Sequence, residues 1–374
     1  MSSIAPFHPP SRLLLGPGPS MAAPSVLAAM AKPLLGHLDP AFVDMMEEIK
    51  AMLREVFQTK NRMTFPVSGT GSAGMEFCCA NLIEPGDEVI VGINGVFGGR
   101  LAEVATRCGA TVTKVEAEWG RIIEPAQIAA ALENRRPKLV AMIHAETSTG
   151  ALTPIPEISK LAHEAGALML IDAVTSLAGC PVELDTWDID AVYSGTQKCL
   201  SCPPGLAPVS LSDRALAVAT SRKHKVQSWY LDVNLLASYW GAERVYHHTA
   251  PISMNYALHE ALRVVLEEGL EARFARHERN HLRLKAGLAE LGLEIASQPG
   301  HQLWQLNSVT VPEGVDEARV RAKLLSDFGI EIGAGLGPLK GKVWRIGLMG
   351  ESSTADNVDI VLNALGQVLS DNAG

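Results

Sequence analysis

No uninterrupted apolar run in this 374-residue chain approaches the roughly 18 residues of a membrane-spanning helix. Residues 1–10 lack the basic-then-apolar order of a signal peptide, and the six cysteines form neither a disulfide framework nor a metal-ligand spacing. The chain also lacks positive charge: its formal net charge is −9, which argues against nucleic acid or an anionic membrane as the main partner. We therefore expect a reduced, cytoplasmic protein without a bound metal.

At 374 residues the chain exceeds one ordinary hydrophobic core, so two domains are expected. Apolar strand patterns alternate with helical patterns over its first half, which indicates an α/β domain with a mostly parallel sheet. The expected strands are 89–93, 111–115, 139–143 and 168–171, and the expected helices are 40–57, 75–83, 98–108, 125–132 and 155–165. Ligands of such sheets bind beyond the carboxyl ends of the strands.

The order of elements changes towards the C-terminus. A long helical pattern over 254–291 has Gly269 near its middle, and strands at 308–311 and 343–348 then alternate with helices at 315–328 and 357–369. We expect an extended N-terminal arm over 1–20, rich in proline and glycine, a large α/β domain over 21–268 and a small α+β domain over 269–374.

Lys198 follows a short strand pattern, Ala191-Val192-Tyr193, and a turn of small residues, and Pro203-Pro204-Gly205 restrains the chain after it. A partly buried lysine has a lowered pKa, which frees its amine to attack an aldehyde. The alternative is a surface lysine at a strand end.

Gly69, Gly71 and Gly74 match the G-x-G-x-x-G pattern of dinucleotide-binding turns. We reject that function because a helical segment precedes the motif, and because Asp87 stands before the next strand rather than at its end. A glycine-rich turn at a helix N-terminus still binds phosphate through free backbone N–H groups, helped here by the hydroxyls of Thr70 and Ser72. A plain strand-to-helix turn is the alternative.

Asp172 follows the apolar run 168–171, where a carboxylate is costly unless a cation or hydrogen-bond donors meet it. It either caps a helix that begins nearby or pairs with a buried, protonated ring nitrogen. The adjacent His247 and His248 lack a second pair of ligands, so no zinc site is expected.

A lysine after a strand, an aspartate and an upstream phosphate turn together suit pyridoxal 5′-phosphate. At these positions, and at several short motifs across nearly the whole chain, the sequence resembles the class V aminotransferases of fold type I, in particular the alanine–glyoxylate and serine–glyoxylate (serine–pyruvate) enzymes. The motifs are 14–19, 57–59, 68–71, 84–87, 147–150, 194–198, 246–249 and 341–347.

The resemblance implies roles for individual residues. Lys198 resembles the lysine that forms an imine with the cofactor, and Asp172 resembles the partner of the pyridine nitrogen. Arg345 resembles the residue that grips the substrate carboxylate, which a planar guanidinium does better than lysine; a solvated strand charge is the alternative. The remaining cofactor and substrate contacts that it implies are Thr70, Gly71, Ser72 and Gln197 at the phosphate, Phe97 on the ring, Thr147 near the ring hydroxyl, Tyr246 and Thr249 at the phosphate of a partner subunit, and Gly18 and His37 on the substrate side.

The family implies a homodimer that moves an amino group from alanine or serine to glyoxylate or a similar 2-oxo acid. The ureidoglycine–glyoxylate aminotransferases of purine breakdown look very similar and are the alternative, although they carry Gln where this chain has His37 and Asn where it has Tyr246. Cysteine desulfurases share the fold but use a cysteine well after the lysine, and none follows Cys202. A cofactor-binding protein without turnover would be expected to have lost Lys198 or Arg345.

Overall fold

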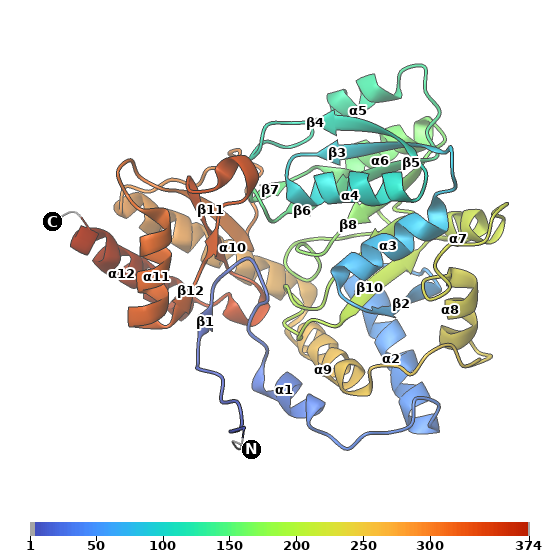
Figure 1. Ribbon diagram of the computed structural model, residues 1–374, viewed down its shortest axis with the longest axis horizontal. Helices are drawn as coiled ribbons and strands as arrows, with labels where there is room; N and C mark the ends of the chain where they lie inside the picture. Colours follow the sequence, from blue (N-terminus) through green and yellow to red (C-terminus); the bar gives the residue numbers. More distant parts are fainter. Residues whose placement is uncertain (1–3, 373–374) are drawn as a thin grey trace.

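A seven-stranded sheet organises the larger part of the molecule (Figure 1). The structure is a computed structural model that describes residues 4–372. Along the sheet the strands are β2 (Met63–Ser68), β10 (Leu206–Leu211), β9 (Ala191–Tyr193), β8 (Leu168–Asp172), β5 (Leu139–Ile143), β3 (Glu88–Ile93) and β4 (Thr111–Glu116). The run from β9 to β4 is parallel, and β10 is antiparallel to both of its neighbours, β2 and β9. The expected α/β fold with a mostly parallel sheet is confirmed.

Period-two alternation divides each parallel strand between two hydrophobic cores. In β5, Val140 and Met142 join one core, whereas Leu139, Ala141 and Ile143 join the core on the opposite face. Helices α5 (Pro125–Leu132), α6 (Ile155–Glu164) and α9 (Ile252–Glu268) cover the first face, and α3 (Gly71–Leu82), α4 (Val96–Arg107), α7 (Asp213–Thr220) and α8 (Val233–Trp240) cover the second. The continuous apolar strands of the sequence are therefore those of a sheet buried on both sides.

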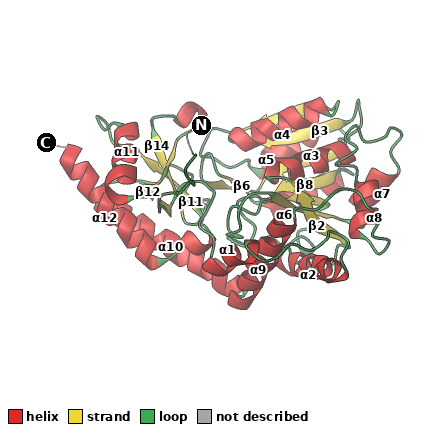
Figure 2. Ribbon diagram, turned by 60° about the horizontal axis from the view of Figure 1, so that its bottom comes forward, coloured by secondary structure: helices red, strands yellow, loops and turns green. Residues whose placement is uncertain are grey.

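The C-terminal part forms a smaller unit with its own core. Its three-stranded sheet has the order β11 (Leu306–Thr310), β14 (Val343–Gly347) and β13 (Gly333–Ala334), and it is packed by α10 (Leu270–Glu290), α11 (Glu317–Phe328) and α12 (Ala355–Asn372). Helices α9 and α10, separated at Gly269 as expected, run beneath both units (Figure 2). The expected boundary at residues 268 and 269 stays a prediction.

The N-terminal arm ends in regular structure that the sequence did not predict. Strand β1 (Leu13–Leu14) pairs in parallel with β12 (Ile330–Glu331), and Leu15 is buried in the core of the C-terminal unit. Residues 1–3 of the expected arm lie outside the described residues. The arm next passes the turn after β9 before entering α1 (Pro24–Met30) and α2 (Pro40–Val56), whose first turn is capped by Asp39.

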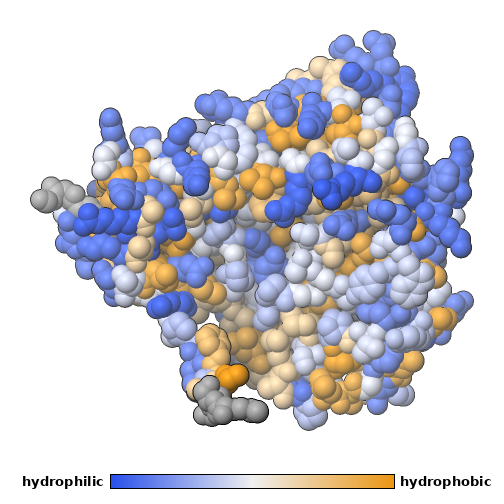
Figure 3. Space-filling view, in the orientation of Figure 1, coloured by the Kyte–Doolittle hydropathy of each residue, from blue (hydrophilic) through white to orange (hydrophobic). Residues whose placement is uncertain are grey.

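Two surface properties bear on partners. None of the helices within residues 4–372 combines the length and apolarity of a membrane span. Large apolar side chains are nevertheless exposed on the segment that leads from α1 to α2, namely Leu34, Leu35 and Leu38. Figure 3 shows hydrophobic side chains along the lower edge of the molecule, where Figure 1 places this segment.

Candidate active site

One pocket gathers most of the residues that the sequence singled out. It lies beyond the carboxyl ends of β5, β8 and β9, as expected for a parallel sheet. Its lining includes the predicted residues Thr70, Gly71, Ser72, Phe97, Thr147, Asp172, Gln197 and Lys198. Three loops and two helix N-termini, far apart in the chain, thus meet at one place.

Lys198 follows β9 and is only 9% exposed, so the surface-lysine alternative is wrong. Its Nζ donates a hydrogen bond to the carbonyl oxygen of Pro17. Burial, reinforced by the charge of Arg345, lowers the pKa of Lys198 to about 8, although Asp172 acts to raise it. About a tenth of this amine is therefore unprotonated and nucleophilic at pH 7, far more than at the ordinary lysine pKa.

Gly18 accounts for the close approach of the N-terminal arm to this lysine. Its φ is +105°, and a Cβ there would lie 2.6 Å from Nζ of Lys198. The Ser20 hydroxyl donates to the Lys198 carbonyl at 2.6 Å, and the Ser20 N–H donates to the Gln197 carbonyl at 2.9 Å. The arm is thus part of the wall behind the lysine.

Asp172 ends β8 and is 3% exposed. Its Oδ1 accepts the N–H of Val174 at 2.8 Å, but no helix begins between residues 173 and 190, so the helix-cap alternative is wrong. Burial raises the pKa of Asp172 to about 7, opposed by the Val174 N–H, by Tyr193 and by the charge of Lys198. Among the described residues no basic side chain forms an ion pair with it.

The turn before α3 has the form that the glycine pattern suggested. Thr70 is the N-cap of α3, yet its side chain makes no capping hydrogen bond, so its hydroxyl and the first N–H groups of the helix are available to an anion. The Oε1 atom of Gln197 is buried without a partner, and an amide can present either end by a half-turn. Asp87, the acidic residue of the rejected dinucleotide reading, pairs with Lys138 at 2.7 Å.

Glu146 is a buried residue of the site that the sequence interpretation missed. Its Oε2 accepts the N–H groups of Phe97 at 3.1 Å and Gly98 at 3.3 Å, and its Oε1 accepts the Ser148 hydroxyl at 2.5 Å. The carboxylate therefore holds the N-terminus of α4 and with it Phe97, whose ring lines the pocket. The guanidinium carbon of Arg100 lies over this ring, 5.0 Å from its centroid. The sequence feature that could have indicated Glu146 is the polar segment 144–150, which directly follows β5.

Arg345 stands on β14, the central strand of the C-terminal sheet; it does not line the pocket but contacts Thr147, which does. It is 7% exposed, which excludes a solvated strand charge. Nε donates to the Ala334 carbonyl at 2.7 Å, and a terminal nitrogen donates to the carbonyl of Thr147 at 3.1 Å. Burial lowers the pKa of Arg345 to about 10, opposed by Glu146, so the guanidinium remains charged near neutral pH.

The remaining predicted residues lie outside this pocket. Tyr246 is 59% exposed, Thr249 is exposed, and neither lines the cavity of its own chain. His37 lies against Tyr246, with ring centroids 5.2 Å apart. The segment that carries them is tied to the phosphate turn, because His248 Nε2 is 2.7 Å from the Ser68 hydroxyl.

The pocket fits pyridoxal phosphate on its own features. A buried carboxylate without a cation suits a protonated ring nitrogen, and a helix N-terminus with free donors suits a phosphate. A buried lysine of lowered pKa lines the same pocket. The fold and this site together define a pyridoxal-phosphate-dependent transferase of fold type I.

The chain belongs to the aminotransferase class-V family, whose model matches residues 13–361. The protein is thus a transaminase of a pyridoxal-phosphate-dependent family. It is 43% identical to the (S)-ureidoglycine–glyoxylate transaminase of Bacillus subtilis, covering 99% of this chain and 93% of that one. It is 41% identical to the alanine–glyoxylate aminotransferase of Mus musculus, over 97% and 89% of the two chains. The crystal structure of an alanine–glyoxylate aminotransferase from Nostoc has a TM-score of 0.97 at 49% identity, covering 98% of this chain and 97% of that one.

Proposed function

We propose that this protein transfers the amino group of a small amino acid, alanine or serine, to glyoxylate or a similar 2-oxo acid. The observation that carries the proposal is the buried Arg345 next to a pocket lined by Lys198 and Asp172. Amino donor and oxo acceptor each present one carboxylate, which a single guanidinium can hold in both half-reactions. The likeness to alanine–glyoxylate aminotransferases supports glyoxylate as the acceptor.

In this proposal the pocket residues hold the cofactor by complementary chemistry. Pyridoxal phosphate supplies an aldehyde that reacts with amines and a ring that accepts electrons. Asp172 keeps the ring nitrogen protonated, and Thr70, Gly71, Ser72 and Gln197 hold the phosphate. Phe97 would pack on the ring, and Thr147 would lie near the ring hydroxyl.

Lys198 has two tasks in the proposal. Its unprotonated amine would hold the cofactor through the cofactor's aldehyde, and as a free amine it would take the proton from the substrate Cα and deliver it to the former aldehyde carbon of the cofactor. Both tasks need an amine whose pKa is close to the working pH, and burial lowers the pKa of Lys198 to about 8. The reverse sequence on the oxo acid completes the transfer.

A second candidate donor is (S)-ureidoglycine, because the chain is 43% identical to a transaminase of that name. His37 and Tyr246 argue against it, since both differ from the residues expected in that subfamily. The two rings are neighbours, with centroids 5.2 Å apart, so both differences fall at one place. We therefore favour alanine or serine.

We also propose that the working form is a homodimer with shared sites. Tyr246 and Thr249 are exposed on their own chain, which leaves them free to reach the phosphate of a partner's site. The exposed Leu34, Leu35 and Leu38 lie on the segment that also carries His37, next to Tyr246. Exposed apolar side chains beside a functional polar group are typical of an interface.

A half-reaction screen tests the proposed donor. The purified holoenzyme is mixed in turn with alanine, serine, glycine and ureidoglycine, and loss of the cofactor's aldehyde absorbance is followed with time. We expect the largest rate constant with alanine or serine, and glyoxylate should restore the original spectrum. A largest rate constant with ureidoglycine would assign the alternative function, and no change with any donor would refute both. Lys198→Ala is the control.

A further inference from the structure

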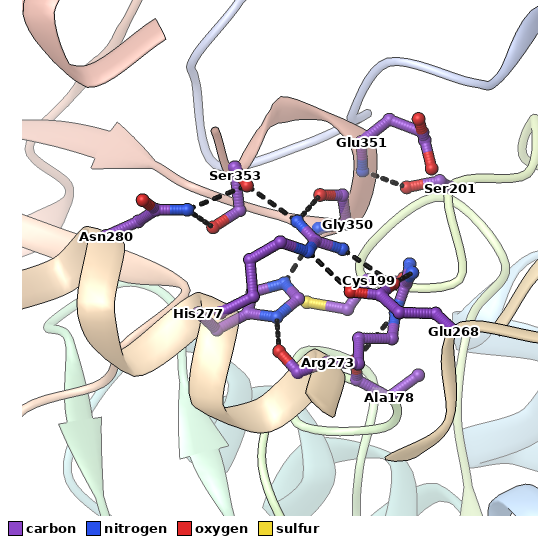
Figure 4. A network of polar contacts seen from close by, with 11 residues as sticks. Ala178, Cys199, Ser201, Glu268, Arg273, His277, Asn280, Gly350, Glu351 and Ser353 are labelled. Atoms are coloured by element: carbon purple, nitrogen blue, oxygen red, sulfur yellow. Dashed lines mark hydrogen bonds and ion pairs between the residues drawn. The ribbon is translucent and has the colours of Figure 1, made fainter. Parts of the chain in front are cut away.

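A buried arginine lies behind the turn that carries Lys198. Arg273, on α10, is 1% exposed, although burying a guanidinium is costly unless its donors are paired. Nε donates to the Ala178 carbonyl at 3.2 Å, one terminal nitrogen to Glu268 at 2.5 Å, and the other to the Cys199 carbonyl at 2.6 Å (Figure 4). The last contact is one residue from Lys198.

The charge of Arg273 is balanced within the same cluster. Glu268 also accepts from Arg276, at 2.6 Å and 2.9 Å. Although burial acts to raise it, the hydrogen bonds and charges of Arg276 and Arg273 lower the pKa of Glu268 to about 2. Arg276 further donates to the carbonyls of Gly350 at 2.9 Å and Ser353 at 2.6 Å. The cluster therefore joins α10 to the loop after β14.

His277 also holds the loop after β14, and its hydrogen bonds allow only one tautomer of its ring. Nδ1 lies 2.8 Å from the Arg273 carbonyl, which can only accept, so Nδ1 carries the hydrogen. Nε2 then accepts the Gly350 N–H at 2.9 Å. Burial, followed by the charge of Arg273, lowers the pKa of His277 to about 3, so the ring stays neutral. Both ring nitrogens are thus used to hold backbone.

The Lys198 turn is held at three residues, Lys198, Cys199 and Ser201. The Lys198 carbonyl accepts from Ser20 and from the Ser201 N–H, the Cys199 carbonyl accepts from Arg273, and the Ser201 hydroxyl accepts the Glu351 N–H at 2.8 Å. There is no spare room, since a Cβ on Gly350 would lie 1.8 Å from Oγ of Ser201 and 2.8 Å from the Cys199 carbonyl oxygen. The peptide after Lys198 is therefore fixed from behind by the C-terminal unit.

We infer that Arg273 is a positioning residue for transamination: by holding the Cys199 carbonyl it sets the direction in which the Lys198 side chain enters the pocket. The inference rests on the proposed role of Lys198 as the group that moves the proton at Cα. A displacement of about 1 Å in a reacting group can cost about a hundredfold in rate. Substrate carboxylate binding should change little, because Arg345 keeps its own contacts to Ala334 and Thr147.

Arg273→Lys tests this, with Arg283→Lys as the matched control. Arg283 is also on α10, but it is exposed and pairs with Asp359, at 2.7 Å and 2.6 Å. With alanine and glyoxylate, Arg273→Lys should lower kcat by about ten- to a hundredfold while KM for alanine changes by less than about threefold. The effect of deuterium at the alanine Cα on kcat should increase, because proton transfer becomes slower. Arg283→Lys should match the wild type in each measurement.

A second readout does not depend on turnover. In the cofactor-free protein, the rate at which an amine-reactive reagent labels Lys198 is measured against pH by peptide mass spectrometry. The midpoint should lie near the pKa of about 8 in the wild type and move towards the ordinary 10.5 in Arg273→Lys, because the amine becomes less confined. An unchanged midpoint together with an unchanged kcat would overturn the inference. If the wild type turns over no amino acid, the proposed function fails, and the labelling alone decides the positioning role.

Ser201→Ala serves if Arg273→Lys does not fold. It removes one contact to the Lys198 turn, from the Glu351 N–H, and leaves every buried charge in place. We expect a fall in kcat of at least about threefold and the same direction of change in Lys198 labelling. If Ser201→Ala behaves as the wild type in both, the turn does not need to be held and the inference is wrong.

Discussion

Replacing Asp172 by Asn should change stability and activity in opposite directions. In the cofactor-free protein, burial raises the pKa of Asp172 from 3.8 to about 7. A carboxyl with a raised pKa binds more protons folded than unfolded, so its contribution to stability falls as pH rises from about 4 to about 7. Above pH 7 the ionised carboxylate destabilises the fold by at most roughly 4 kcal/mol, from about 1.36 kcal/mol for each pKa unit. Asn carries no charge and keeps an acceptor for the Val174 N–H, so it should remove that cost.

The holoenzyme should respond in the other direction. The charge of Asp172 on a protonated ring nitrogen is worth about 4 kcal/mol at 4 Å for an effective dielectric constant near 20. If this interaction energy is lost in the transition state, kcat falls by about a thousandfold, since each factor of ten corresponds to about 1.4 kcal/mol. Cofactor retention should be weakened as well.

Two measurements decide the Asp172 prediction. Urea unfolding of the cofactor-free wild type and of cofactor-free Asp172→Asn is measured at pH 5 and pH 8. The free energy of unfolding of Asp172→Asn should exceed that of the wild type by more at pH 8 than at pH 5. The rate constant of the half-reaction with alanine should fall by several powers of ten. A cofactor-free variant no more stable at pH 8 than the wild type would show that the ionised carboxylate does not destabilise the fold. A full rate would remove Asp172 from the chemistry.

The other substitutions address the lysine, the carboxylate anchor and the choice of donor. Lys198→Ala should abolish transamination, and borohydride reduction of the wild-type holoenzyme followed by peptide mapping should place the cofactor on Lys198; label on another lysine would contradict the assignment. Arg345→Lys should raise KM for amino acid and oxo acid alike, because both present one carboxylate to the same guanidinium, so an effect on only one substrate would exclude a shared anchor. Changing His37 to Gln together with Tyr246 to Asn should shift the ratio of kcat/KM values towards ureidoglycine, and an unchanged ratio would remove the basis for preferring alanine or serine.

Most of the part built on the seven-stranded sheet could be predicted because its strands are buried on both faces and appear as continuous apolar runs. Strand β10 was missed, since Pro208 in a run that follows Pro203-Pro204-Gly205 argues against a central strand. In the fold Pro208 stands opposite Pro66 of β2 in the antiparallel register. The pairing of β10 with β2 and β9 thus forms a strand that the local prolines argue against.

Residues of the candidate pocket could be named from the sequence wherever one residue type carries a recognisable chemistry, as with Lys198 and Asp172 after their strands. Glu146 and Arg273 could not, because their importance depends on which distant groups surround them. Arg273 is 74 residues from the carbonyl of Cys199 that it holds, and no local pattern encodes that contact. The role of a buried charge depends on its partners, and only the fold shows which distant residues these are.

The last prediction concerns the shared site of the proposed dimer. In an isologous pair, each site would take Lys198 from one chain and Tyr246 with Thr249 from the other. Inactive Lys198→Ala chains are mixed and reassembled with chains that carry Tyr246→Ala and Thr249→Ala, after the second variant is shown to be weak by itself. A mixed dimer then has both defects in one site and an intact second site.

With equal and random reassembly, half of the dimers are mixed and half of their sites are intact, so activity should rise towards about a quarter of the wild type. Native mass spectrometry of chains with different tags verifies that mixing has occurred. Reassembly of wild-type chains alone, under the same conditions, sets the full scale. If the mixture never exceeds the average of its two parents, each site is built within one chain. Tyr246 and Thr249 would then have to act on their own pocket, although neither lines it.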